Sequence, residues 1–112
     1  MRKYSDFPSC PIATFTMLMG NKWKLMIIRD LINGETFFGD LKRDLTGISH
    51  KVLTENLRAL EDDGLIHRTV HEGKVVRVSY GMTEFGMTLA PIYSAIANWG
   101  TEYKKHFYGQ DI

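Results

Sequence analysis

The side chains best suited to chemistry in this sequence are basic ones on a short amphipathic segment, residues 49–63. On a helical wheel at 100° per residue, Leu53, Leu57 and Leu60 share one face. Four charged residues lie on the opposite face, and these are Lys51, Glu55, Arg58 and Asp62. The pattern predicts a helix that buries its leucines and presents its charges to solvent.

Such a charged face can bind nucleic acid. Lys51 and Arg58 are of the types that contact phosphates or guanine edges in the major groove. Thr54 can touch a thymine methyl group or a phosphate, and His50 can contact a phosphate. Glu55 either accepts from a cytosine amine or pairs with Lys51 four residues earlier, and we favour the pair. The alternative is the ordinary solvated face of a surface helix.

The residues before this segment predict a second short helix and a tight turn. Ser49 suits the N-cap position, since its hydroxyl can accept from an N–H of the first turn, and Gly64 suits the stop. Residues 46–48, Thr-Gly-Ile, predict the turn. Lys42 and Arg43 lie on the preceding helix, which is indicated by Phe38, Leu41 and Leu45. Two short helices across a tight turn are typical of a helix-turn-helix.

A β-hairpin is predicted directly after these helices. Residues 65–71 and 75–80 alternate in strand fashion, and residues 72–74 form the expected tip, with Gly73 free to take a positive φ. Three basic residues lie on the hairpin: Arg68, Lys74 and Arg77. A basic hairpin beside the two helices predicts a wing that lies along the DNA backbone or minor groove. The alternative is a solvated hairpin with scattered charge.

The remaining helices predict a homodimer. Pro11 suits a first helical position, and the expected first helix carries Phe15 and Leu18. A second helix is expected to end near residues 33–34, and Thr83 is a candidate cap for the final helix. That last helix carries more large apolar groups than one small domain needs: Leu89, Ile92, Ile96, Trp99 and Tyr103. Because wet apolar surface is costly, we expect this stripe to pack against a second copy.

Composition fits one small domain spanning residues 1–112. Hydrophobic residues make up 44% of the 112 residues and charged residues 24%, so disorder is not expected. The net charge of +1 neither demands nor excludes nucleic acid. One cysteine, no secretory signal and no apolar run long enough for a membrane span predict a cytoplasmic protein. The expected fold is therefore mainly α with a small β-hairpin, a winged helix-turn-helix.

Several motifs in order resemble one family. They are Cys-Pro at 10–11, GNKWK at 20–24, FGDL at 38–41, GISHKVLT at 47–54, LRALEDDGLIHR at 57–68 and VSYGMTEFG at 78–86. Together they are similar to the HxlR family of bacterial winged-helix regulators. The resemblance implies a dimer, built by the first and last helices, that presents two recognition helices to adjacent major grooves of an inverted-repeat operator. Some family members activate transcription and others repress it.

The resemblance also implies a use for Cys10, because some members respond to oxidants or electrophiles through a cysteine in the Cys-Pro motif. A helix N-terminus favours a thiolate, so we expect oxidation of Cys10 to change DNA affinity. The alternative is a merely tolerated cysteine. The sequence departs from the family at the wing, which lacks the usual proline, and at Phe37, where the family often has a basic residue. The shape of the wing and one backbone contact are thus open.

No enzyme, metal site or cofactor is expected. The histidines are scattered, and His67 and His71 lie on a predicted strand without cysteine or carboxylate partners. Two other readings stay open: a winged domain that binds only another protein, and an effector pocket near Trp23, Phe15 and Trp99.

Overall fold

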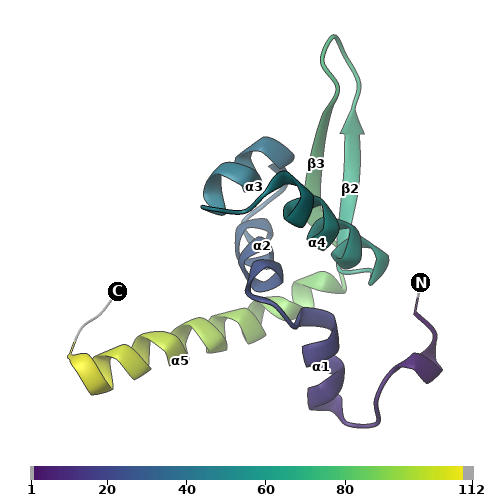
Figure 1. Ribbon diagram of the computed structural model, residues 1–112. Coiled ribbons are helices and arrows are strands. Elements are labelled where there is room, and N and C mark those ends of the chain that lie inside the picture. The colour runs from purple at the N-terminus through teal and green to yellow at the C-terminus, as the bar shows by residue number, and fades with distance from the viewer. Residues whose placement is uncertain (1, 110–112) are drawn as a thin grey trace.

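The computed structural model describes residues 2–109 as five α-helices, two short 3₁₀ helices and a small sheet (Figure 1). In chain order the elements are η1 Tyr4–Asp6, α1 Pro11–Met19, α2 Lys22–Ile32, β1 Thr36–Phe37, α3 Phe38–Asp44, α4 His50–Asp62, β2 Ile66–His71, β3 Arg77–Met82, η2 Gly86–Leu89 and α5 Ala90–Tyr108. The domain bounds predicted at residues 1 and 112 lie outside the described residues. This order is that of a winged helix-turn-helix, as predicted.

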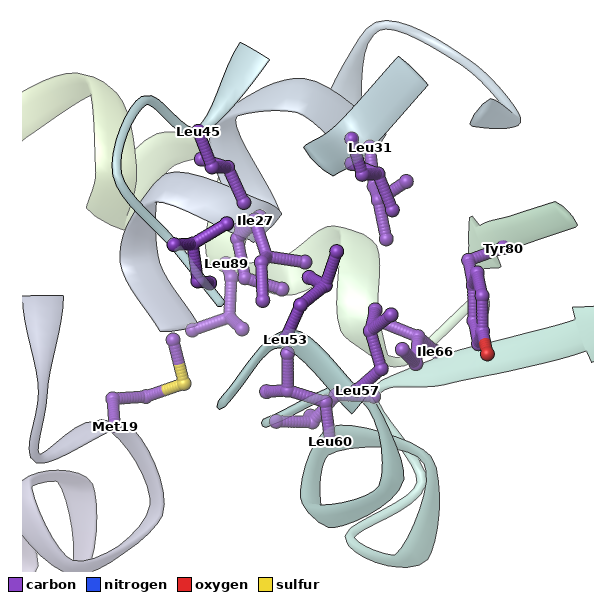
Figure 2. Packing of buried hydrophobic residues seen from close by; sticks show 14 residues of the cluster. Met19, Ile27, Leu31, Leu45, Leu53, Leu57, Leu60, Ile66, Tyr80 and Leu89 are labelled. Carbon is purple, nitrogen blue, oxygen red and sulfur yellow. The ribbon is translucent and has the colours of Figure 1, made fainter. Parts of the chain in front are cut away.

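The core forms where α4 crosses α2 and the base of the sheet. Leu53, Leu57 and Leu60 are at most 1% exposed and pack with Ile27 and Ile28 of α2 (Figure 2). The leucine spacing of three and four residues places these side chains on one face of α4, so burying them turns the opposite face outward. The helical wheel therefore predicted the buried side of α4 correctly.

Local backbone conformation and hydrogen bonds fix the turn before α4 and the position of α4 relative to α2. Gly47 takes a φ of 88° in the turn between α3 and α4, a conformation that glycine adopts without steric cost. The hydroxyl of Ser49 accepts from the backbone N–H of Val52 at 3.1 Å, which confirms the predicted N-cap. Inside the fold, the buried Asn56 accepts from the side-chain amide of Asn21 at 3.0 Å. The N-cap residue of α2 is thereby tied to the middle of α4.

The sheet has three strands in the order β1-β3-β2, whereas two strands are predicted from sequence. The added strand, β1, pairs Thr36 and Phe37 with Tyr80 and Ser79. Two residues are too few to show an alternating pattern, which explains why sequence periodicity misses β1.

The wing also differs in its loop from the prediction. The last β2–β3 pair is His71 with Arg77, so residues 72–76 form the loop, and Val75 and Val76 lie outside the strands and exposed. The positive φ predicted at Gly73 is wrong, since the glycines with positive φ among the described residues are Gly34, Gly47, Gly64 and Gly109.

The final helix starts later than its apolar pattern suggests. Thr83 accepts from the backbone N–H of Gly86 at 2.9 Å, so its hydroxyl contacts the start of η2, and it does not cap α5, whose N-cap residue is Leu89. Pro91 lies in the first turn of α5 and starts the helix afresh. Leu89, predicted to lie in the dimer interface, is 8% exposed and packs in the core of its own chain. That prediction is wrong in this structure, and the interface proposed below excludes Leu89.

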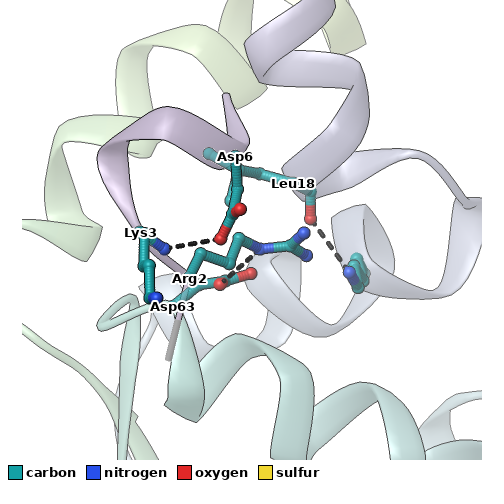
Figure 3. A network of polar contacts seen from close by, with 6 residues as sticks. Arg2, Lys3, Asp6, Leu18 and Asp63 are labelled. Atoms are coloured by element: carbon teal, nitrogen blue, oxygen red, sulfur yellow. Dashed lines mark hydrogen bonds and ion pairs between the residues drawn. The ribbon is translucent and has the colours of Figure 1, made fainter. Parts of the chain in front are cut away.

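The N-terminal arm docks on the C-terminal end of α4. Arg2 Nε donates to Asp63 Oδ1 at 3.0 Å, and the backbone N–H of Lys3 donates to Asp6 at 2.7 Å (Figure 3). Nearby, the buried Lys24 Nζ donates to the carbonyl of Leu18 at 3.0 Å, holding the end of α1 against α2. Among the described residues, no helix is both long and apolar enough to cross a membrane.

Candidate nucleic-acid interface

The outer face of α4 carries the side chains that the sequence singled out. Lys51, Glu55 and Arg58 are exposed, and Thr54 is half-buried at the flank. Lys51 Nζ lies 3.9 Å from Glu55 Oε1, which confirms the predicted pair. Both side chains are largely exposed, so the ion pair is weak, and Lys51 can leave Glu55 to bind a phosphate. Four polar positions of α4 therefore remain available to a partner.

A first groove runs between α4 and β2. Its volume is about 270 Å³, and it is lined by Thr54, Arg58, Glu61, Arg68 and Tyr80. Arg58 and Arg68 come from different elements and form no ion pair within residues 2–109. The two guanidinium groups outnumber the single carboxylate of Glu61 in this groove, so its lining suits an anion such as a phosphate.

A second groove of about 410 Å³ lies between the α3–α4 pair and β3. His50 lines it from the start of α4, and its ring lies 4.9 Å from the ring of Phe38. Arg77 lines it from the wing, with its guanidinium carbon 3.7 Å from the ring centre of Phe37. Tyr80 borders both grooves, so the two hollows adjoin along the α4–wing junction. The fold thus places Arg58 with Arg68 in one groove and His50 with Arg77 in the other, and these grooves lie next to each other.

The other predicted DNA contacts lie at the margins of this surface. Lys42 and Arg43 are exposed on α3, where Arg43 is paired with Asp40 of the first turn. Lys74 is exposed in the wing loop, away from both grooves. The structure therefore gathers the arginines of α4 and the wing, and leaves Lys42 and Lys74 as outlying charges.

One polar chain at the base of the wing escaped the sequence analysis. Ser79 Oγ donates to Glu35 Oε2 at 2.5 Å and lies 2.7 Å from His71 Nε2. The three residue types match a hydrolytic triad, but the order does not, because serine here lies between the acid and the histidine. Ser79 is also 1% exposed and closed to a substrate. Glu35 and Ser79 are 44 residues apart, so the sequence gives no signal of their contact, which forms because β1 pairs with β3.

The residues assigned to sensing and to the dimer lie away from these grooves. Cys10 is exposed at the N-cap position of α1. Phe15 and Leu18 of α1 are half-buried and pack against the core. The stripe on α5 is exposed, with Trp99 at 69%, and it consists of Ile92, Ile96, Trp99 and Tyr103. The aromatic row continues beyond the predicted residues to Phe107, whose ring lies 4.8 Å from that of Tyr103.

Known proteins are similar to this chain in sequence and in fold. The profile of the HxlR-like helix-turn-helix family matches residues 18–108. The HTH-type transcriptional regulator YdeP of Bacillus subtilis is 39% identical over 99 residues, which are 88% of this chain and 77% of that protein. The crystal structure of a regulator assigned to the MarR family, from Porphyromonas gingivalis, superposes with a TM-score of 0.82 at 35% identity and covers 90% of this chain and 98% of that one.

A second similar structure is that of the redox regulator HypR in its reduced form. It superposes with a TM-score of 0.83 at 33% identity and covers 90% of this chain and 100% of that chain. The motifs, the winged helix-turn-helix architecture and these relatives agree. The chain therefore belongs to the HxlR-like helix-turn-helix family and is a transcriptional regulator of the helix-turn-helix type, not an enzyme.

Proposed function

We propose that this regulator binds double-stranded DNA as a homodimer, with α4 in the major groove and the wing along the adjacent backbone. The observation that carries the proposal is the orientation of α4. Its leucines are buried in the core, while Lys51, Thr54 and Arg58 face outward beside the wing. Helix N-termini and outer faces with these residue types are what recognition helices present to base edges and phosphates.

We assign phosphate contacts and base contacts to different parts of this surface. Arg58 and Arg68 share the α4–β2 groove, and we assign them to one stretch of DNA backbone. His50 and Lys51 lie in the first turn of α4, nearest the floor of a major groove, and we assign base-edge or phosphate contacts to them. Lys42 and Arg43 of α3 and Lys74 of the wing loop add long-range attraction.

We assign the dimer interface to α1 and α5. The exposed stripe on α5 has spacings of four, three and four residues, which is the pattern of a helix that packs on another helix. An exposed apolar strip of this length is costly for a monomer and favourable for a pair. Two-fold pairing places the two α4 helices about 34 Å apart on one side of the duplex and requires an inverted-repeat operator.

We further propose that Cys10 makes DNA binding sensitive to thiol oxidants. Its thiol is exposed, and HypR, a similar protein, is named a redox regulator. The segment before Cys10 is attached to the end of α4 through Arg2 and Asp63, so a displaced arm would disturb the recognition helix. Because the chain has one cysteine, a disulfide must join two copies or one copy and a small thiol.

We also propose that the protein acts in the cytoplasm, because a regulator that binds the chromosome must be in the same compartment as the DNA.

The competing function is a winged domain that binds only another protein. The electrostatic response separates the two, since counterion release makes DNA binding fall steeply with salt. Both functions are compatible with the expected single domain, residues 1–112 with terminal helices at the dimer interface.

Arg58→Ala should weaken binding to duplex DNA from the region flanking the protein's own gene. We expect a loss of roughly 1–3 kcal/mol and a salt slope smaller by about one charge, because we assign Arg58 to the DNA backbone. Fluorescence anisotropy with a salt titration measures both. Lys104→Ala, which removes one positive charge from α5, is the matched control and should bind as the unmodified chain does. Absence of binding at low salt would favour the protein-binding alternative.

Trp99→Ala should shift the chain from dimer to monomer. A central interface tryptophan typically contributes about 2 kcal/mol or more, so the dimer dissociation constant should rise at least tenfold. Sedimentation equilibrium measures it, and circular dichroism checks that the fold persists. Tyr4→Ala, which removes a 95% exposed aromatic ring from the arm, should leave the dimer intact. An unmodified chain that sediments as one copy at all concentrations would refute the dimer.

Diamide should change the DNA affinity of the unmodified chain and leave that of Cys10→Ser unchanged. The reason is that diamide joins thiols into disulfides, and Cys10 is the only thiol. Anisotropy with and without diamide, followed by reduction, checks the effect and its reversal. An equal response from both proteins would end the sensor proposal.

A further inference from the structure

The base of the wing holds a cluster of side chains on one face of the sheet. Phe37 of β1 lies opposite Ser79 of β3, and His71 of β2 lies opposite Arg77. Directly opposed residues of antiparallel strands project to the same side, and positions 77 and 79 share a side as well. Four side chains from three strands therefore meet there, and we call them, with Glu35, the wing clamp.

Phe37 is the centre of this clamp. The guanidinium carbon of Arg77 lies 3.7 Å from the centre of its ring, close enough for a cation–π contact. The imidazole of His71 lies against the same ring, with 5.2 Å between the ring centres. Arg77 is consequently held in one direction by an aromatic surface, although it remains exposed to a ligand.

A hydrogen-bonded chain locks the strands beneath this contact. Ser79 has a single hydroxyl proton, which it donates to Glu35 Oε2 at 2.5 Å. The contact of 2.7 Å between Ser79 Oγ and His71 must then be donated by the imidazole Nε2–H. Ser79 is buried on β3, the central strand. The hydrogen bonds from Glu35, just before β1, through Ser79 to His71 on β2 therefore connect all three strands.

The wing needs such an anchor. Beyond the pair His71 and Arg77, its loop is open to solvent, and Val75 is 75% exposed. A two-stranded ribbon is only marginally stable by itself, so its direction must be fixed at the base.

We propose that Phe37, supported by Glu35, Ser79 and His71, is a positioning residue that presents Arg77 to a DNA phosphate. The inference rests on the proposed DNA binding and deepens it, because it assigns one contact to a fixed geometry. An arginine that is already oriented loses less side-chain freedom on binding, and its planar fork suits a phosphate. Arg77 therefore contributes more to affinity than the unanchored Lys74 of the loop.

A double-mutant cycle with Phe37→Leu and Arg77→Ala tests the positioning role. We expect Arg77→Ala to weaken DNA binding about five- to tenfold in the unmodified background and less than twofold in the Phe37→Leu background. Phe37→Leu should also reduce the salt slope, while Phe37→Tyr, which keeps the ring face, should restore both values. Lys74→Ala, an equal loss of charge from the loop, should give the same small effect in either background.

Nuclear magnetic resonance tests the clamp without DNA. The Nε–Hε resonance of Arg77 should be shifted by the ring current of Phe37, and the shift should vanish in Phe37→Leu but persist in Phe37→Tyr. An unshifted Arg77 resonance would overturn the inference directly. Additive effects in the cycle, with tight binding by the unmodified chain, overturn the positioning role alone. Failure of the unmodified chain to bind any duplex at low salt defeats the proposed function, and the positioning role with it.

Discussion

Burial of one face of α4 is the constraint on which the rest of the molecule depends. Leu53, Leu57 and Leu60 fill the core, and each such side chain contributes roughly 1.5–3 kcal/mol when removed from water. The helix therefore has one rotational setting about its axis, and that setting decides which residues face outward. Asn56 reinforces it from the buried side through its bond to Asn21. The candidate recognition surface is in this sense a consequence of core packing.

The same small core explains why the other end of the molecule is apolar and open. A domain of this size buries a modest share of its surface, and α5 runs across the end opposite the wing without a buried residue of its own (Figure 1). Leu89, just before α5, is the last residue that the core accommodates. The stripe from Ile92 to Phe107 is exposed, so the proposed pairing surface is separate from the candidate DNA surface.

Sequence patterns predicted what depends on local periodicity and local capping. The helices, the buried face of α4, the Ser49 cap and the pair of Lys51 with Glu55 follow from spacings of three or four residues. Features that need distant segments were missed: β1, and the chain from Glu35 through Ser79 to His71, which forms only when β1 pairs with β3.

The predictions for the wing loop and for the placement of Leu89 were wrong for a related reason. Strand register, not residue type, sets where β3 begins, and the ladder ends at Arg77 despite the β-forming Val75 and Val76. Leu89 fits the apolar spacing of α5, but a 3₁₀ turn before Pro91 redirects it into the core. In both cases tertiary contacts overrode a local pattern.

In the proposed complex, two copies present their outward α4 faces to a single duplex. Hydroxyl-radical footprinting of the full chain on DNA flanking its own gene tests this arrangement. We expect two protected segments, related by an inverted repeat, with centres one helical turn (about 34 Å) apart. A single protected segment, or no protection at low salt, would contradict it.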